Sequence, residues 1–161
     1  MFVLIKFKVL LLIVSIFLYL GISFASIPKT TQFISCSLPG NNSRQALFTL
    51  DNSSQKISYE FIRNGKVELK VLFNEHNNLL RFYDHNMGVL YYGFKRGQYS
   101  YVFMVIKGVE KDEYSMSFDV KKDDKVIQSS DCLPSSFRSN DVNSKFIRNV
   151  SSNGNEEFDF P

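Results

Sequence analysis

Apolar and polar residues alternate with a period of two through most of the region between residues 45 and 132. This is the spacing of a β-strand with one buried face. In KISYEFI, residues 56–62, the side chains of Ile57, Tyr59 and Phe61 share one face of the predicted strand. Eight segments are predicted as strands in this way: 45–50, 56–62, 66–73, 79–84, 90–94, 99–103, 113–120 and 125–132. Their short connections predict an all-β fold, an antiparallel meander of about eight strands forming a small barrel or sandwich.

The stretch LYYGFKRGQYSYVFMV, residues 90–105, is the most aromatic of these regions and predicts a β-hairpin. Glycine tolerates the positive φ of a two-residue hairpin loop, so we place the loop at Arg96-Gly97. The facing pairs are then Phe94 with Tyr99, Tyr92 with Tyr101, and Leu90 with Phe103. One face of the hairpin is continuously aromatic, and the simplest interpretation is that the core buries this face.

The tyrosines of this hairpin are also the candidate binding residues of the chain. A buried tyrosine usually finds a partner for its hydroxyl, and a row of exposed hydroxyls would form the polar rim of a binding surface. The candidates are Tyr91, Tyr92, Tyr99 and Tyr101. Tyr91 lies on the opposite face from the aromatic row, so we expect it to tolerate substitution, provided that it packs against nothing else.

The hairpin around Asn64-Gly65 raises a question of parity. The segments before and after this pair both carry their apolar residues at odd positions, and a loop of only two residues would set odd apolar positions opposite even polar ones. The pattern therefore predicts a loop of odd length. We favour three residues, Arg63-Asn64-Gly65, which places Glu60 opposite Glu68, whereas five residues would place Glu60 opposite Lys66.

The N-terminal segment has the features of a secretory signal peptide. Two lysines precede an uncharged apolar run at residues 9–20, and small residues allow cleavage after Ala25. Residues 1–25 are therefore the predicted signal peptide, and the protein is expected in the periplasm or outside the cell, with no stable membrane anchor after cleavage. An uncleaved anchor is the alternative, because the apolar character continues to Ile27.

Composition divides the remainder of the chain at residue 134. Residues 26–134 form the predicted β domain. Residues 135–161 are rich in Ser and Asn and predict a flexible polar tail. Scattered aromatic residues such as Phe137, Phe146 and Phe160 leave room for the tail to dock on a partner or on its own domain.

The charge balance excludes one class of partner. Without the two lysines of the signal peptide, 17 basic residues face 16 acidic ones, and the charges are interspersed. Nucleic-acid-binding proteins carry a basic patch or stripe, because they must neutralise phosphates. We therefore expect no nucleic-acid partner.

Cys36 and Cys132 are the two cysteines of the chain, and they lie near the two ends of the patterned region. In a chain bound for an oxidising compartment they predict a disulfide, with two buried free thiols as the alternative. Closing so long a loop stabilises a fold by roughly 4–5 kcal/mol in the chain-entropy model.

The sequence shows no catalytic or cofactor-binding motif. His76 and His85 each stand beside an acid, but their spacing matches no zinc motif. No serine lies in a GxSxG motif, and the glycines are scattered singly rather than gathered in a phosphate-binding loop. We therefore expect no metal site, no cofactor and no enzymatic activity.

Several segments carry a resemblance to known proteins. ISYEFIRNGKVELKV, GQYSYVFMV and the closing SSDC are similar to segments of small exported one-disulfide β-proteins of Gram-negative bacteria, over roughly residues 33 to 132. The layout also resembles that of periplasmic lysozyme inhibitors. Those carry a serine-glycine loop and a tryptophan strand that this chain lacks, so no functional residue is carried over. The resemblance implies a compartment and an architecture, with binding of a partner as its extension.

Taken together, export, small size and a disulfide-tied scaffold without catalytic residues favour a protein that binds another protein. An immunity protein against a toxin, or an inhibitor of a cell-wall hydrolase, is the leading hypothesis. The alternatives are a non-catalytic β-barrel module for a small ligand or glycan, and an accessory protein of the envelope.

Overall fold

The computed structural model describes residues 29–108, 113–139, 142–151 and 160–161. Within these residues the chain forms eleven β-strands in two sheets and no helix. The same residues therefore include no apolar helix long enough to cross a membrane. The predicted all-β class is confirmed. The predicted signal peptide, residues 1–25, lies outside the described residues.

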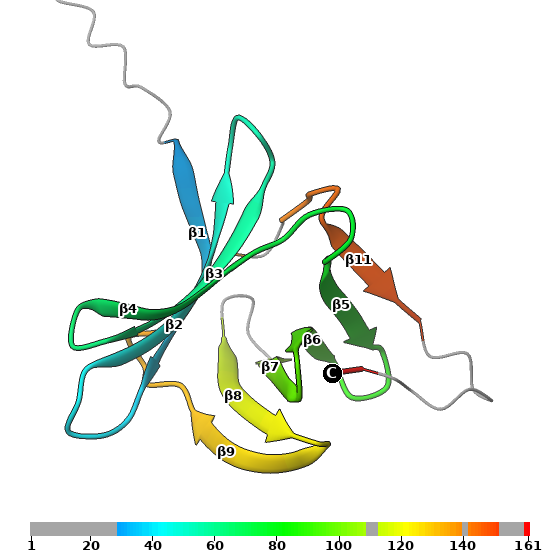
Figure 1. Ribbon diagram of the computed structural model, residues 1–161. Helices are drawn as coiled ribbons and strands as arrows, with labels where there is room; N and C mark the ends of the chain where they lie inside the picture. Colours follow the sequence, from blue (N-terminus) through cyan, green and yellow to red (C-terminus); the bar gives the residue numbers. More distant parts are fainter. Residues whose placement is uncertain (1–28, 109–112, 140–141, 152–159) are drawn as a thin grey trace, which may run out of the picture.

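The strands follow one another through two sheets as a meander (Figure 1). The first sheet, in the order β10-β1-β2-β3-β4, contains β1 (Thr30–Leu38), β2 (Arg44–Asp51), β3 (Ile57–Arg63), β4 (Lys66–Leu72) and β10 (Phe137–Arg138). The second sheet, in the order β11-β5-β6-β7-β8-β9, contains β5 (Leu79–Asp84), β6 (Val89–Arg96), β7 (Tyr99–Lys107), β8 (Tyr114–Lys122), β9 (Lys125–Asp131) and β11 (Ile147–Val150). All neighbours are antiparallel except β11 and β5, which are parallel. The sheets do not close, so the sandwich rather than the barrel is observed.

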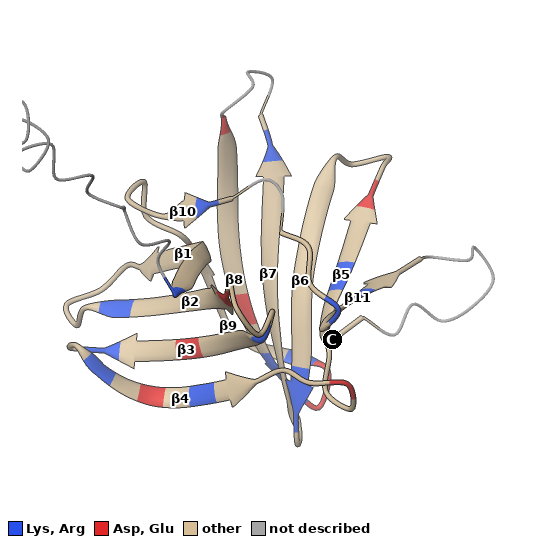
Figure 2. Cartoon of the chain, turned by 90° about the horizontal axis from the view of Figure 1, so that it is seen from above, with Lys and Arg blue, Asp and Glu red and all other residues tan. Residues whose placement is uncertain are grey.

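The two sheets cross each other around an aromatic core. Figure 2 shows β3 and β4 running across the direction of β6, β7 and β8, as in an orthogonal sandwich. At the centre, the ring of Phe48 on β2 lies 5.3 Å from the ring of Tyr59 on β3 and 5.0 Å from that of Phe103 on β7. Tyr92 and Phe94 on β6 are also buried. The prediction that the core buries the aromatic face of the β6–β7 hairpin is confirmed for Tyr92, Phe94 and Phe103, whereas Tyr101 is half-buried and Tyr99 is exposed.

The predicted register of that hairpin is wrong by two residues. The loop is Gly97-Gln98, and Phe94 faces Tyr101 while Tyr92 faces Phe103. Gly97 has a φ of 61° and occupies the first loop position, where a type II′ turn needs a positive φ. The predicted loop would have put Arg96 there. A shift of two residues leaves every side chain on its face, which is why the faces were predicted correctly.

The loop between β3 and β4 also differs from the prediction of an odd length. Asn64 and Gly65, with φ values of 50° and 75°, form a two-residue loop, and a β-bulge restores the parity two positions further on. Glu60 consequently faces Lys70, with which it forms an ion pair, and not Glu68. The β8–β9 hairpin uses the same device, with Asp123-Asp124 as its loop and a bulge after Val120.

The alternation rule misses β1, the first strand of the domain. A bulge lies between Gln32 and Ile34, and the four consecutive residues from Phe33 to Cys36 are all buried. Irregular pairing and burial on both faces remove the period of two on which the rule depends.

The predicted disulfide between Cys36 and Cys132 is confirmed, with Cα atoms 5.2 Å apart across a sequence separation of 96. It joins β1 in the first sheet to the residue after β9 in the second. Beside it, the Leu133 N–H donates to the Ser37 carbonyl (2.8 Å), and the Ser37 N–H donates to the Ser136 hydroxyl (2.9 Å). We call this place, with the neighbouring Tyr114, the disulfide corner.

Part of the predicted tail, residues 135–161, belongs to the β domain instead. β10 pairs with β1, and β11 pairs with β5. Between them Val142 and Phe146 are buried in the common core. The polar composition of the segment hides these anchors, because two buried apolar residues are enough to dock a short stretch of chain on an existing sheet.

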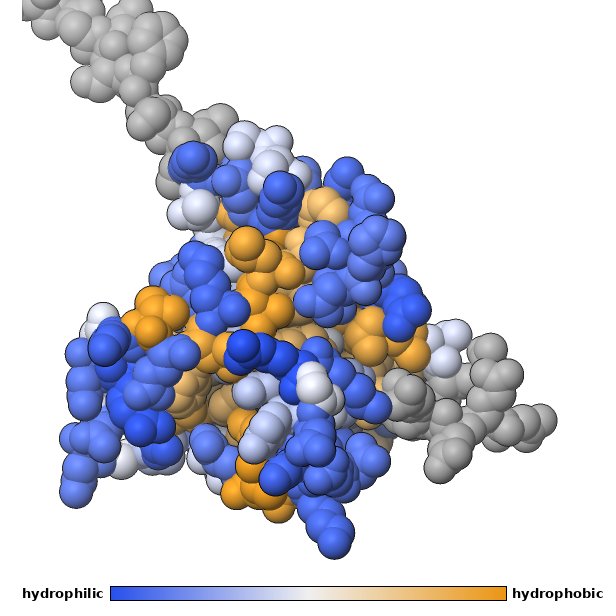
Figure 3. Space-filling model, in the orientation of Figure 1, coloured by the Kyte–Doolittle hydropathy of each residue, from blue (hydrophilic) through white to orange (hydrophobic). Residues whose placement is uncertain are grey.

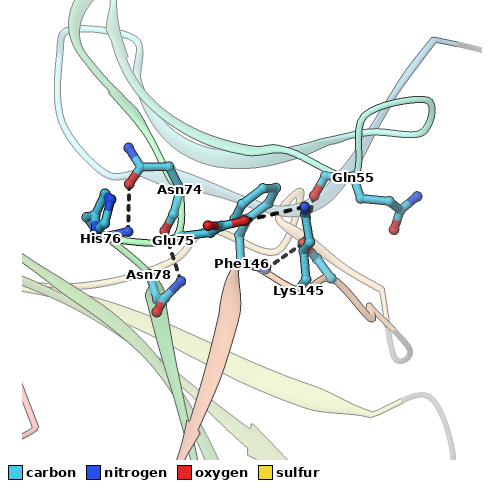
Figure 4. A network of polar contacts seen from close by, with 8 residues as sticks. Gln55, Asn74, Glu75, His76, Asn78, Lys145 and Phe146 are labelled. Atoms are coloured by element: carbon cyan, nitrogen blue, oxygen red, sulfur yellow. Dashed lines mark hydrogen bonds and ion pairs between the residues drawn. The ribbon is translucent and has the colours of Figure 1, made fainter.

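A network of polar contacts holds this segment in place (Figure 4). The Ser144 hydroxyl donates to the Gln55 carbonyl (2.7 Å) and accepts from the Phe146 N–H (3.1 Å). The Leu79 N–H donates to the Phe146 carbonyl (3.0 Å), which starts the pairing of β5 with β11. The domain boundary at residue 134 is therefore wrong for the described part of the tail.

Tyr91 is not the freely exposed residue that the pattern predicts. On the outer face of the second sheet its ring lies 5.7 Å from that of Phe82 and 5.9 Å from that of Phe160. Phe160 and Pro161 lie over Gly93, where an added Cβ would be only 2.9 Å from the Phe160 ring. Burial, followed by the charge of Asp84, raises the pKa of Tyr91. Both faces of the hairpin are thus covered in part.

Candidate functional site

The edges of β4 and β9 lie on opposite sides of a gap between the sheets. Each of these strands has a neighbour on one side only within the described residues. A pocket of about 360 Å³ lies there, lined from the first sheet by Tyr59, Phe61 and Leu69 and from the second by Tyr101, Phe118 and Gln128. Figure 3 shows apolar surface in the hollow between the β4 side and the β9 side of the molecule. We call this place the open corner.

The walls of the pocket are mainly aromatic because strands of both sheets point their core-facing residues into it. The ring of Tyr101 on β7 lies 5.9 Å from that of Tyr59 on β3 and 6.5 Å from that of Phe118 on β8. Tyr101 also stacks on Phe94, at 4.8 Å and an interplanar angle of 7°. The walls are therefore an extension of the core that solvent reaches, and they suit a flat or apolar group.

Tyr59 of β3 lines this pocket from the first sheet and carries a buried hydroxyl. The residue is fully buried, yet its hydroxyl has no hydrogen-bond partner among the described residues. Burial, followed by the nearby Tyr101, raises the pKa of Tyr59, so the hydroxyl stays protonated at physiological pH. Leaving such a group unpaired costs about 1–3 kcal/mol. A buried polar group without a partner in a native fold is therefore a candidate ligand contact.

Gln128 on β9 supplies a second group of this kind. It faces Val120 of β8 and lines the pocket, and its Nε2 atom is buried without a partner among the described residues. An amide nitrogen only donates hydrogen bonds. Two unpaired polar atoms from opposite sheets therefore belong to one pocket.

Charged side chains complete the lining. Arg63 of β3 is paired with Glu68 of β4 at 3.3 Å, and Arg96 lies at the end of β6. The pKa of Tyr101 is raised by burial, and Arg96 opposes this rise, as a positive charge close to the phenol does. With the Arg63 charge balanced by Glu68, the guanidinium of Arg96 leaves the pocket lining net positive.

The hairpins next to the pocket add further basic residues. The β8–β9 loop touches the β6–β7 loop through a hydrogen bond from the Asp123 N–H to the Gln98 carbonyl (3.0 Å). Figure 2 shows Lys and Arg at the end of β6 beside this loop. Lys95 and Lys121 lie beside Pro161 instead, where Lys121 donates to the Pro161 carbonyl (3.3 Å). The other charged residues of the two hairpin ends are three basic and two acidic ones: Arg96, Lys122, Lys125, Asp123 and Asp124. The rim of the open corner therefore favours an acidic partner.

The four tyrosines predicted as a binding surface do not lie together. Tyr99 and Tyr101 line the pocket, and Tyr99, 37% exposed, has the ammonium of Lys122 at 5.9 Å from its ring centre. Tyr92 is a core residue, and Tyr91 is on the outer face of its sheet. The pattern does not single out Tyr59 or Gln128, because only the crossing of the two sheets brings these residues into one pocket.

The two histidines do not gather with other metal-binding residues. The backbone N–H of His76 donates to the Asn74 side-chain oxygen (2.9 Å), and the ring of His85 lies 4.5 Å from that of Tyr83. The described residues contain no group of three or more His, Cys, Asp or Glu positioned to hold a metal ion.

Comparison of the chain with protein-family models, with curated proteins and with solved structures found no match. The resemblance to small exported proteins of Gram-negative bacteria therefore stays a prediction from the sequence.

Proposed function

We propose that this chain is an exported, non-catalytic binding protein that takes an extended segment of another protein at the open corner. Two observations on the described residues carry the proposal: the edges of β4 and β9 have no second neighbouring strand, and the pocket between them is lined by residues with buried polar atoms that have no hydrogen-bond partner. A segment lying along β4 or β9 would satisfy the backbone groups of the edge and place a side chain in the pocket.

The exposed apolar residues of the two edge strands support this binding mode. Val67 on β4 and Val126 and Ile127 on β9 are 45%, 55% and 58% exposed. Lys66 and Lys70 on β4 and Lys125 at the start of β9 protect these edges against pairing with unrelated chains. Because Lys70 is paired with Glu60, Lys66 and Lys125 are the lysines that favour an acidic segment as the partner.

The rest of the molecule suits a binding role because it is rigid. One aromatic core joins the two sheets, and the disulfide joins them at another corner. A preorganised surface loses little conformational entropy when it binds. An immunity protein against a toxin, or an inhibitor of a cell-wall hydrolase, is the role we propose for such a scaffold in the envelope.

Photo-crosslinking tests where the partner binds. A benzoylphenylalanine at Val126, on the edge strand β9, should capture one polypeptide, which mass spectrometry identifies. The matched control is Met87, which is 69% exposed in the loop at the opposite end of β6 and should capture none.

The captured protein is then purified and its affinity for the chain is measured. Ile127→Lys should weaken the complex at least tenfold, and Met87→Lys should leave it unchanged. Equal capture at both positions, or an Ile127→Lys variant that binds normally, would contradict the proposal.

A second candidate function is binding of a small ligand in the pocket. It is favoured by the depth of Tyr59, whose hydroxyl an edge-bound main chain alone would not reach.

A further inference from the structure

The open corner offers a ligand three donors: the Tyr59 hydroxyl, Gln128 Nε2 and the guanidinium of Arg96. Gln128 Nε2 and the guanidinium of Arg96 can only donate hydrogen bonds. The Tyr59 hydroxyl stays protonated and has one hydrogen to give. The carboxylate of Glu68 is an acceptor in the lining, and Arg63 holds it at 3.3 Å.

A sugar fits this set poorly. Each sugar hydroxyl presents a donor as well as acceptors, so it matches donors without a partner less completely than a group with acceptors alone. A carboxylate presents acceptors only, and it gains most from neutral donors and a guanidinium in a partly dry pocket. The aromatic walls, in turn, suit an apolar or aromatic body behind that carboxylate.

From these donors and walls we propose that the pocket of the open corner binds a carboxylate carried on an apolar or aromatic body, with Tyr59, Gln128 and Arg96 as its contacts. The inference rests on the proposed function in placing the ligand site at the open corner. The carboxylate has two sources, the partner polypeptide or a free organic acid, and both present the same chemistry to the pocket.

The first experiment compares 3-phenylpropionate with 3-phenylpropanamide, which has the same shape without the charge. Binding to the intact protein is followed by the NMR signals of the Gln128 side-chain amide and of the tyrosine rings. The acid should bind at least tenfold more tightly than the amide and should shift the Gln128 signal. Equal binding of both probes, or no shift with the acid at millimolar concentration, would overturn the proposal.

Two variants assign the contacts. Tyr59→Phe removes only the hydroxyl, and Gln128→Leu removes only the amide. Each should weaken the acid at least fivefold and leave the weak binding of 3-phenylpropanamide unchanged. Tyr83→Phe is the matched control, because Tyr83 lines a different pocket on β5, and it should bind the acid normally. Unaltered acid binding by both variants would overturn the assignment of the pocket.

A third probe distinguishes the two sources of the carboxylate. The acetylated peptide Thr-Val-Thr-Val-Phe is used with a free C-terminal carboxylate and as its amide. If a polypeptide supplies the group, the peptide acid should bind at least tenfold more tightly than 3-phenylpropionate, and its amide should lose that gain. If the peptide acid binds no more tightly than 3-phenylpropionate, the natural ligand is a free organic acid, and the proposed carboxylate site still stands.

The failures of the two proposals are distinguishable. If the acid binds through Tyr59 and Gln128 but no polypeptide is captured at Val126, the proposed function is wrong and the proposed carboxylate site is correct. If a polypeptide is captured at Val126 but the acid and the amide bind equally well, the carboxylate site is wrong and the proposed function stands.

Discussion

A tyrosine lies at each of two corners of the sandwich, and the two tyrosines differ in the hydrogen bonds of their hydroxyls. At the disulfide corner the Tyr114 hydroxyl donates to the Ser136 carbonyl (3.3 Å) and accepts from the backbone N–H of Arg138 (3.2 Å). At the open corner the Tyr59 hydroxyl is more deeply buried and has no partner among the described residues. The first tyrosine ties segments of the chain together. The second retains unused bonding capacity, as expected of a residue that meets a ligand.

The corners also differ in how they are closed. A disulfide and the pairing of β10 with β1 cover one of them. The other leaves β4 and β9 with one neighbouring strand each among the described residues. A pocket lies at both corners, of about 600 Å³ beside Tyr114 and Cys132 and of about 360 Å³ at the open corner, so the corners differ in how their sheets are linked and not in the presence of a pocket. Links between its sheets stabilise a small domain, and a strand edge without a neighbour can pair with another chain.

Removal of the disulfide should give the largest change. The double variant Cys36→Ala, Cys132→Ala loses the constraint on the unfolded chain, and the free energy of unfolding should fall by roughly 4–5 kcal/mol in the chain-entropy model. Urea denaturation measures this loss, and reduction of the wild-type protein should reproduce it. A loss below about 1 kcal/mol would mean that the hydrogen bonds of the corner suffice without the covalent link.

Truncation of an aromatic residue should cost more stability in the core than at the open corner. Phe103→Ala removes a fully buried ring and should cost about 3–5 kcal/mol. Tyr101→Ala removes a half-buried ring that lines the open corner, so its cost should be clearly smaller. Urea denaturation of both variants provides the comparison. Equal losses would show that the open corner is as fully packed as the core.

Alkaline pH should destabilise the protein through Tyr59. Its pKa is raised in the folded state by burial, so the stability that its proton confers is fully present below the unfolded tyrosine pKa of about 10 and is lost as pH rises above it. The loss should approach about 1.4 kcal/mol per pH unit above pH 10. Tyr59→Phe should lose less over the same range in urea denaturation at pH 9 to 11. Parallel curves for the two proteins would contradict the raised pKa.

The smallest expected difference in stability is that between removal of the Tyr114 hydroxyl and removal of the Tyr59 hydroxyl. Tyr114→Phe breaks two hydrogen bonds of the disulfide corner and should lower the free energy of unfolding by about 1 kcal/mol. Tyr59→Phe removes a buried hydroxyl that has no partner in the described part of the chain, so stability should stay constant or rise. Thermal and urea unfolding measure both. A clear loss for Tyr59→Phe would indicate that its hydroxyl is satisfied within the protein and is not free for a ligand.

The sequence alone determined which side chains face the core on most strands. The alternation of Ile57, Tyr59 and Phe61, and that of Tyr92 and Phe94, follows from the local geometry of an extended chain, in which successive side chains point to opposite faces. The same local reasoning located the turns of the β3–β4 and β6–β7 hairpins to within one residue. The pairing of Cys36 with Cys132 followed from the presence of just two cysteines in a chain expected in an oxidising compartment. An error of two residues in the β6–β7 register did not alter the faces, because parity survives an even shift.

Only the tertiary structure decided the bulges, the docking of the C-terminal segment and the open corner. The bulge after Phe61 reconciles a tight Asn64-Gly65 turn with the core-facing residues of β4, which requires both strands to be seen at once. Val142 and Phe146 are buried only because a finished sheet receives them. Tyr99 and Tyr101 were candidates from the pattern, but their pocket also needs Tyr59 and Gln128. These residues come from two sheets that cross, and local periodicity carries no information about such a crossing.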